Sequence, residues 1–257
     1  MILTVSHISL IMKKNSFYKD ELEGYLKENG FISFNFFPSV KNPQIKRQFC
    51  HKFSPFHDLH LWKDKEGKQF EIVYLEDAAE DFVSSFYPIF GCTGFEKSEK
   101  EIISSDIRIR TFGNVFGRIY CCGYSSRSGL SGILYETLDM ETSLCLWSSL
   151  GFTLLSKSPE KAILEFRSLA GKNFNLVLTS ISEEKDRSTP GFDQPGLRSI
   201  AIIATDIQEV QNRVRKLGFD VTGIDEVTVG RNVFEVSFIF GKNKEIVEIL
   251  KLSKKKL

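Results

Sequence analysis

The side chains best suited to acid–base or metal chemistry are concentrated near the N-terminus. All four histidines lie there: His7, His51, His57 and His60. With Cys50, the last three form the pattern Cys50-His51-x5-His57-x2-His60, which has the residue types of a zinc site but a spacing that matches no structural zinc pattern. If residues 56–62 form a strand, the odd spacing places His57 and His60 on opposite faces, so only one of them can approach His7.

Nucleophilic catalysis has no support in the sequence. There is no Gly-x-Ser-x-Gly elbow, no histidine follows His60 to act as a base, and no glycine-rich phosphate loop occurs. The five cysteines are an odd number, and Cys121 and Cys122 are adjacent, which is a poor arrangement for bridging. This usage indicates a reducing compartment. Catalytic residues therefore stay unassigned from sequence alone.

Three stretches of the chain share the same landmarks. A Gly-Lys phrase followed by Glu or Asn leads into an apolar strand at Gly67–Leu75, Gly171–Thr179 and Gly241–Ile249. A Gly-Phe pair lies upstream of each phrase, and a strand of alternating polarity lies further upstream. Matched landmarks at three places indicate an internal repeat, which limits the fold more than any single motif.

Each repeated unit is predicted to have the order β-α-β-β-β. In the third unit an alternating strand at 197–205 precedes Asp206, an expected helix N-cap with Glu209 three residues on. Gly218 ends that helix, and three strands follow. The second unit repeats the layout, with Asp139 as its N-cap. The predicted fold class is therefore α+β, with repeated modules that pair into curved mixed sheets and form a cleft.

The units give the expected domain boundaries. We expect a first module at 1–77 that carries an inserted loop at 38–55, and two further modules at 128–183 and 195–252 that together form one domain, 128–257. Residues 78–127 hold an apolar stretch and two candidate strands. They are either an eroded module or a linker insertion. The first module is expected to pair with this segment or to form a homodimer.

Composition and charge exclude several classes of partner. Apolar residues make up 42% of the 257 residues and charged residues 26%, which is typical of a globular protein. A net charge of +1 gives no support for nucleic-acid binding. The N-terminal apolar run is interrupted by polar residues and followed by its positive charges, so we interpret it as a strand, and no stretch reaches transmembrane length. We expect a cytoplasmic protein with no nucleic-acid or membrane partner.

These landmarks resemble the vicinal oxygen chelate superfamily, which includes glyoxalase I, extradiol dioxygenases and bleomycin-resistance proteins. The resemblance rests on SHISL with DKEGKQFEIV, on TLDMETSLCLWSSLGF, and on ATDIQEVQNRVRKLGF with GKNKEIVEIL. It covers roughly three quarters of the chain. The resemblance implies a small-molecule cleft between paired modules. It also implies one divalent metal (Fe, Mn, Ni or Zn), held by residues of the first and last strands of a module, that chelates adjacent substrate oxygens.

Carried over by position, the resemblance implies His7, Glu71 and Glu245 as metal ligands. His7 precedes the Ile shared by the first strands, and the two glutamates lie four residues after Gly67 and Gly241. Glu248 has odd spacing from Glu245, so only one of them is expected to face the cleft, and the repeat register favours Glu245.

The other two units depart from the ligand pattern. The first-strand position holds Gly132 and Ser199, and the last-strand position of the second unit holds Asn175. Glycine has no donor, and Ser and Asn are poor ligands for a transition ion. Glu136 and Glu165, on expected strands of the second unit, are either acid–base candidates or salt-bridged carboxylates at the rim.

Two function classes follow. The first is a metal-dependent enzyme of lyase, isomerase or dioxygenase type that acts on a small substrate with vicinal oxygens. The second is a non-catalytic small-molecule-binding or structural protein whose metal site has degenerated, with no cofactor. Fold resemblance cannot decide between them, because chemistry depends on the site.

Overall fold

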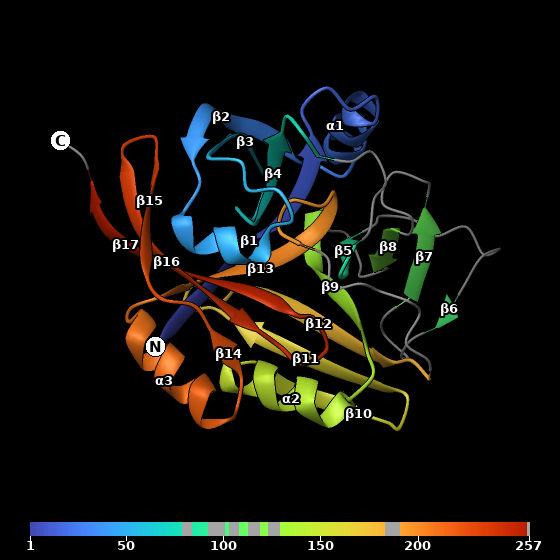
Figure 1. The fold of residues 1–257 in the computed structure, drawn as a ribbon. Coiled ribbons are helices and arrows are strands. Elements are labelled where there is room, and N and C mark those ends of the chain that lie inside the picture. The colour runs from blue at the N-terminus through green and yellow to red at the C-terminus, as the bar shows by residue number, and fades with distance from the viewer. Residues whose placement is uncertain are drawn as a thin grey trace.

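The computed structural model describes residues 1–78, 84–91, 101–102, 108–112, 119–122, 129–182 and 191–255. They form two mixed sheets with α-helices packed against them (Figure 1), which confirms the α+β class. Within these residues, no helix has both the length and the apolar character needed to cross a bilayer. The residues 92–95, a possible echo of the Gly-Phe landmark, lie outside the described part.

The first sheet contains strands from both ends of the chain. Its order is β14-β16-β17-β13-β1-β4-β3-β2, with β15 paired to β16. The first unit supplies β1 (Ile2–Lys13), α1 (Lys19–Glu28), β2 (Ile32–Lys41), the 3-10 helix η1 (Gln44–Phe49), β3 (Phe56–Lys63) and β4 (Gln69–Leu75). The third unit supplies β13 (Gly196–Ala204), α3 (Ile207–Lys216), β14 (Asp220–Val221), β15 (Asp225–Val229), β16 (Asn232–Phe240) and β17 (Ile246–Lys255).

The second sheet has the order β10-β11-β12-β9-β5-β8-β7-β6. The second unit supplies β9 (Gly129–Thr137), α2 (Met140–Ser149), β10 (Thr153–Lys157), β11 (Lys161–Arg167) and β12 (Asn173–Ser180). The remaining strands are β5 (Tyr87–Gly91), β6 (Glu101–Ile102), β7 (Arg108–Phe112) and β8 (Ile119–Cys122). Figure 1 shows α2 and α3 side by side at the bottom of the view, and the two helices contact each other.

The pairing of units differs from the sequence expectation. We expected the second and third units to pair, but β13 runs antiparallel to β1 of the first unit, with Ile2 opposite Ala204 and Ile11 opposite Gly196. The second unit instead pairs through β9 with β5. The expectation was wrong because every first strand has a similar apolar alternation, and partner choice depends on contacts between strands that are far apart in sequence.

The segment between the first and second units has the strand layout of a module. Its β5 is parallel to β8, and β8 is antiparallel to β7, as β1 is parallel to β4 and β4 antiparallel to β3. Of the two alternatives left open by the sequence, this arrangement favours an eroded module over a linker insertion.

The two faces of the first sheet have different roles. Ile8, Leu10 and Met12 of β1 point into the main core, which also contains residues of α1, α2, α3 and the second sheet. The alternate residues His7, Ser9 and Ile11 therefore lie on the opposite face, which we call the site face. Because a strand alternates strictly, burial of one set on the core fixes the orientation of the other.

The site face is enclosed by its own sheet and by one segment. Apolar residues of β15, Val227 and Val229, pack against a cluster that includes Val40 of β2 and Val73 of β4, and β15 contacts β2 from the other end of the sheet. The inserted loop was expected at 38–55, but β2 continues to Lys41, and the covering segment is residues 42–55. From it, Ile45 and Phe49 pack against the apolar cluster of β16 and β17.

Two expected helix caps are present. Asp139 accepts a hydrogen bond from the Thr142 amide at the start of α2, and Asp206 accepts one from Glu209 at the start of α3. Each cap provides an acceptor for an otherwise unpaired amide of the first helical turn. Both aspartates and the helices that follow them could be predicted from the sequence, because a capping interaction involves residues only three positions apart.

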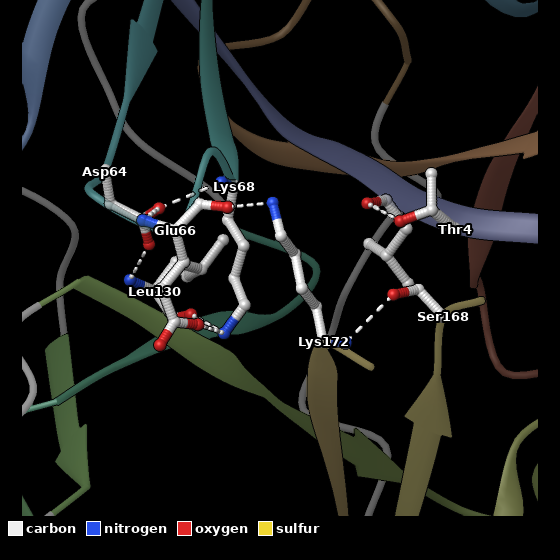
Figure 2. A network of polar contacts seen from close by, with 8 residues as sticks. Thr4, Asp64, Glu66, Lys68, Leu130, Ser168 and Lys172 are labelled. Carbon is white, nitrogen blue, oxygen red and sulfur yellow. Dashed lines mark hydrogen bonds and ion pairs between the residues drawn. The ribbon is translucent and has the colours of Figure 1, made fainter. Parts of the chain in front are cut away.

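The turn before β4 ties the two sheets together (Figure 2). The Asp64 carboxylate accepts hydrogen bonds from the amides of Glu66 at 2.9 Å, Lys68 at 2.8 Å and Leu130, in β9, at 3.0 Å. The Lys68 ammonium donates to the Leu130 carbonyl at 2.8 Å, and Lys172, from the corresponding turn of the second unit, donates to the Glu66 carbonyl. The first strand of the second unit is thereby fixed to the first unit.

Replacing Asp64 should loosen this connection between the sheets. We expect Asp64→Ala to lower the free energy of unfolding by about 2–4 kcal/mol, because a buried amide at Leu130 loses its acceptor. Urea denaturation measures the change. Asp77→Ala is the matched control, since Asp77 is 66% exposed in its ion pair with Lys52, and it should cost less than about 1 kcal/mol. Equal losses in the two variants would contradict a connecting role for Asp64.

Candidate metal centre

Three acidic and imidazole side chains converge on the site face. His7 of β1, Glu71 of β4 and Glu248 of β17 each place one ligand atom within 4.8 Å of the other two. The His7 Nε2 atom is 3.4 Å from Glu71 Oε2 and 3.8 Å from Glu248 Oε2. The three strands are neighbours or near neighbours in the sheet, so residues far apart in sequence meet at one point.

The surroundings of His7 orient its ring. Its Nδ1 lies 3.2 Å from the Ser6 hydroxyl, while its buried Nε2 has no hydrogen-bond partner. Ser9, two residues along the same face of β1, donates to Glu71 Oε1 at 3.0 Å. One ring nitrogen and one carboxylate oxygen are thus held by serines, and the remaining donor atoms face one another. A neighbour that fixes the far side of a ligand is a usual feature of metal sites.

Burial and charge act in opposite directions on the titratable groups. Burial lowers the pKa of His7, but the carboxylates of Glu71 and Glu248 outweigh it and raise the pKa above the usual value. Burial raises the pKa of Glu248, and contact with His7 and the charge of Lys46 outweigh it, so this pKa is lowered. Glu248 is therefore ionised at neutral pH, and the site carries negative charge that a cation can neutralise.

The predicted ligand Glu245 is not part of this cluster. The turn before β17 explains the error. Gly67 and Gly171 have positive φ angles of 78° and 72°, and in the third unit the residue with positive φ, 71°, is Lys244 rather than Gly241. The turn hydrogen bonds agree, since the amides of Gly67, Gly171 and Lys244 each donate to the carbonyl three residues earlier.

The turn and strand of the third unit therefore align with those of the first unit three residues later than the shared Gly-Lys phrase suggests. Counted from the positive-φ residue, Glu248 occupies the place of Glu71, four residues on. The strand ladders confirm this, because Glu71 lies opposite Ser9 and Glu248 opposite Ala201. The shared letters Glu-Ile-Val at 71–73 and 245–247 suggested the wrong alignment. The odd spacing of Glu245 and Glu248 means that only one of them can face the site. The turn geometry shows that this residue is Glu248.

Glu245 has a different role, in contact with the second unit. It is buried and accepts hydrogen bonds from the Ser143 hydroxyl of α2 at 2.5 Å and from the Asn243 amide at 2.9 Å. Burial raises the pKa of Glu245 against the effect of these bonds. The position corresponds to Lys68 and Lys172, which also reach into a neighbouring unit. Glu245 therefore joins the third unit to α2.

The other histidines do not form a zinc site with Cys50. His60 lies on the opposite face of β3, where it contacts Glu23 at 3.7 Å and Ser33 at 2.7 Å. Burial raises the pKa of Cys50 to about 11, which disfavours the thiolate that zinc requires. His57 is buried, and burial together with Lys46 lowers its pKa to about 3, with Glu248 acting in the opposite direction. Of the two histidines, only one of which could approach His7, His57 is the buried one, and its ring is neutral.

The second sheet lacks an equivalent cluster in the described residues. Gly132 lies opposite Asn175, and a Cβ atom on this glycine would be 2.1 Å from the Asn175 carbonyl oxygen. The glycine is therefore required for close strand approach, which leaves no room for a ligand side chain. Glu165 pairs with Arg167, as the salt-bridge interpretation predicts, and Glu136 on β9 lies opposite Thr179.

The donor set of the cluster fits a divalent cation. One imidazole nitrogen and two carboxylates suit Zn²⁺, Fe²⁺, Mn²⁺ and Ni²⁺, and three protein ligands leave positions for substrate or water. The partnerless Nε2 of buried His7 is explained by such an ion, because an orphaned buried polar atom is otherwise costly. The first-strand position of the third unit, Ser199, lies opposite Ser9 in the sheet and adds no strong donor.

Comparison with solved structures identifies the fold. Glyoxalase I from Zea mays matches with a TM-score of 0.65 and 12% identity, over 96% of this chain and 92% of that one. A variant of the same enzyme gives a TM-score of 0.67 at the same identity and coverage. A glyoxalase/bleomycin resistance protein/dioxygenase from Nocardioides matches 51% of this chain and 89% of that one at 19% identity, with a TM-score of 0.36.

No family model and no curated protein matches this sequence. The two glyoxalase I matches nonetheless confirm the vicinal oxygen chelate fold that the resemblance implied. At 12% identity they establish the fold alone, so the activity has to be argued from the residues of this chain.

The corrected register gives a direct test. We expect Glu248→Gln to weaken Co²⁺ binding by about 100-fold or more, because a ligating oxygen is lost. Glu245→Gln should bind Co²⁺ within about twofold of the wild type but lower the free energy of unfolding by about 1 kcal/mol, since one acceptor for Ser143 or Asn243 is lost. Calorimetric titration and urea denaturation measure the two effects. The reverse pattern would restore Glu245 as the ligand.

Proposed function

We propose that this protein is a divalent-metal-dependent enzyme whose substrate presents two adjacent oxygen atoms. The supporting observation is the convergence of His7, Glu71 and Glu248 around a buried His7 Nε2 that has no hydrogen-bond partner. A purely structural cluster of this kind would be expected to close into direct hydrogen bonds. Here the two nitrogen–oxygen separations are 3.4 and 3.8 Å, longer than a good hydrogen bond.

Each residue of the site has a definable task. His7, Glu71 and Glu248 would hold the ion, which when bound would supply Lewis-acid stabilisation of negative charge on the substrate oxygens. Ser6 fixes the orientation of the His7 ring, and Ser9 fixes Glu71. These two serines hold the donors in place before binding, so that little reorganisation is needed.

The covering segment 42–55 would exclude water from the reaction. Ile45 and Phe49 pack with Phe192 and Phe238 in one apolar cluster over the third-unit half of the site face. Exclusion of water strengthens electrostatic interactions within the site. A substrate has to enter beside this segment or displace it. The lyase, isomerase and dioxygenase classes all remain open under this proposal, because each uses a metal that binds two substrate oxygens.

A second candidate function is non-catalytic binding of a small apolar molecule. It is favoured by a cavity of about 440 Å³ beside the covering segment, lined by Phe49, Phe192 and Phe240 among other residues. Such a volume fits a small organic ligand, and aromatic walls are typical of binding sites. This function requires no metal, which separates it from the first.

Metal loading tests the proposal. The tag-free protein, stripped with a chelator, is titrated anaerobically with Fe²⁺, Mn²⁺, Ni²⁺, Zn²⁺ and Co²⁺. We expect one equivalent to bind and to stabilise the fold by about 2.7 kcal/mol at 100 times the Kd. His7→Ala should abolish both effects, whereas His60→Ala, on the other face of β3, should abolish neither.

Activity assays follow on the loaded protein, with hydroxy-ketones, glutathione adducts and catechols as substrates. Turnover that is lost in His7→Ala and kept in His60→Ala would support the enzyme. No binding of any of the five ions would contradict the proposal and leave the aromatic cavity as the functional site.

A further inference from the structure

A lysine from the covering segment lies beside the candidate metal centre. Lys46 of η1 places its Nζ 5.4 Å from the ring centroid of Phe238 and 5.5 Å from that of Phe192. Phe238 is directly opposite Glu248 in the ladder between β16 and β17. Side chains at opposite positions of an antiparallel pair share a face and lie about 5 Å apart. The Lys46 ammonium therefore lies close to a candidate ligand of the ion.

The electrostatic effects of Lys46 agree with this position. Its charge acts to lower the pKa values of Glu248, His57 and His7, and burial has the larger effect on each; the pKa of His7 is nevertheless raised overall, because Glu71 and Glu248 outweigh both burial and Lys46. Three residues from three different strands therefore lie within the range of one ammonium group. Among the described residues Lys46 makes no ion pair, and the two aromatic rings are the groups that hold it.

The segment that carries Lys46 is anchored to the residues just before β13. The Asp193 carboxylate accepts hydrogen bonds from the amides of His51 at 2.9 Å and Lys52 at 2.6 Å. The Phe192 amide donates to the Phe49 carbonyl at 3.0 Å. These contacts anchor the end of the covering segment, so the position of Lys46 follows from the fold rather than from a free surface loop.

The net charge of the site with a divalent ion bound indicates which charge its substrate should carry. The charges of the Glu71 and Glu248 carboxylates and of a divalent ion sum to zero, and a neutral His7 ring adds no charge. The ammonium of Lys46 is then one uncompensated positive charge. Lys46 is partly buried, and a charge that is partly withdrawn from water is costly unless it is paired. A ligand with one negative charge would neutralise it, and a neutral ligand would not.

We propose that Lys46 determines substrate class, and that the substrate is a small anion with a carboxylate next to a second oxygen, as in 2-hydroxy and 2-oxo carboxylates. This inference rests on the proposed function, because the adjacent oxygens are those that the metal centre takes. Beyond the proposed function, this inference specifies that the substrate is negatively charged and that Lys46 recognises the charge. Lys46 stabilises the bound anion and opposes the bound cation, since both lie within its field.

The test uses two ligands of the same shape and different charge. Cobalt-loaded protein is titrated with lactate and with its neutral isostere lactamide, and binding is followed by the visible absorption of Co²⁺. The wild type should prefer lactate. In Lys46→Met the lactate affinity should fall about tenfold, the lactamide affinity should stay within about twofold, and the Co²⁺ affinity should rise.

Opposite changes for anion and cation distinguish a charge effect from damage to the fold, because a damaged site would bind both more weakly. Lys46→Arg keeps the charge and should keep the lactate preference. Lys52→Met is the matched control, since Lys52 lies in the same segment with a side chain that is 70% exposed, and it should change neither affinity.

The possible results separate the two proposals. Unchanged lactate binding in Lys46→Met with normal Co²⁺ binding would overturn the role of Lys46 and leave the proposed function intact. Weaker Co²⁺ binding in Lys46→Met, or loss of lactate preference in Lys46→Arg, would also overturn it and mark Lys46 as structural. Failure of the wild type to bind Co²⁺ would refute the metal-dependent function and this inference with it.

Discussion

The antiparallel ladder between β1 and β13 is the contact on which the candidate site depends. It joins the first and third units into one sheet, so that β17 lies two strands from β1. Without this ladder, Glu248 would be separated from His7 and Glu71, and the first unit alone would offer two ligands. Two donors hold a divalent ion weakly, whereas three define a site with open positions. The candidate site therefore depends on a pairing between residues about 190 positions apart.

Side-chain contacts outside the β1–β13 ladder also hold the units together. Asp64 binds the backbone of β9, and Glu245 binds α2, so the second unit is attached to both halves of the first sheet. Lys68, Lys172 and Glu245 occupy the same place in three copies of one turn, and each contacts a neighbouring unit. One repeated turn thus supplies the contacts between units, and in the first and third units the strand that follows it carries the candidate ligands Glu71 and Glu248.

The two sheets differ in their candidate ligand positions although their strand layouts correspond. In the first sheet, His7, Glu71 and Glu248 form a candidate metal-binding cluster, and a covering segment with aromatic and basic residues packs over that face. In the second sheet, Gly132 and Asn175 approach so closely that no larger side chain fits at the glycine. We interpret the second sheet as support for the first, since its residues contribute to the shared core without offering a ligand cluster in the described part of the chain.

The sequence by itself predicted the strand and helix order of the units, the helix caps at Asp139 and Asp206, and His7 and Glu71 as candidate ligands. Alternation, capping and turn signals act over a few residues, so they can be read locally. Only the tertiary structure decided that the first unit pairs with the third, and that Glu248 rather than Glu245 joins the site. First strands of similar polarity do not specify a partner. The register of β17 is set by the positive φ angle of Lys244. The sequence does not predict it, because Gly241, three residues earlier, is the residue expected to have a positive φ. Lys46 and His57 were placed at the site by long-range packing of the covering segment and of β3, which no local pattern predicts.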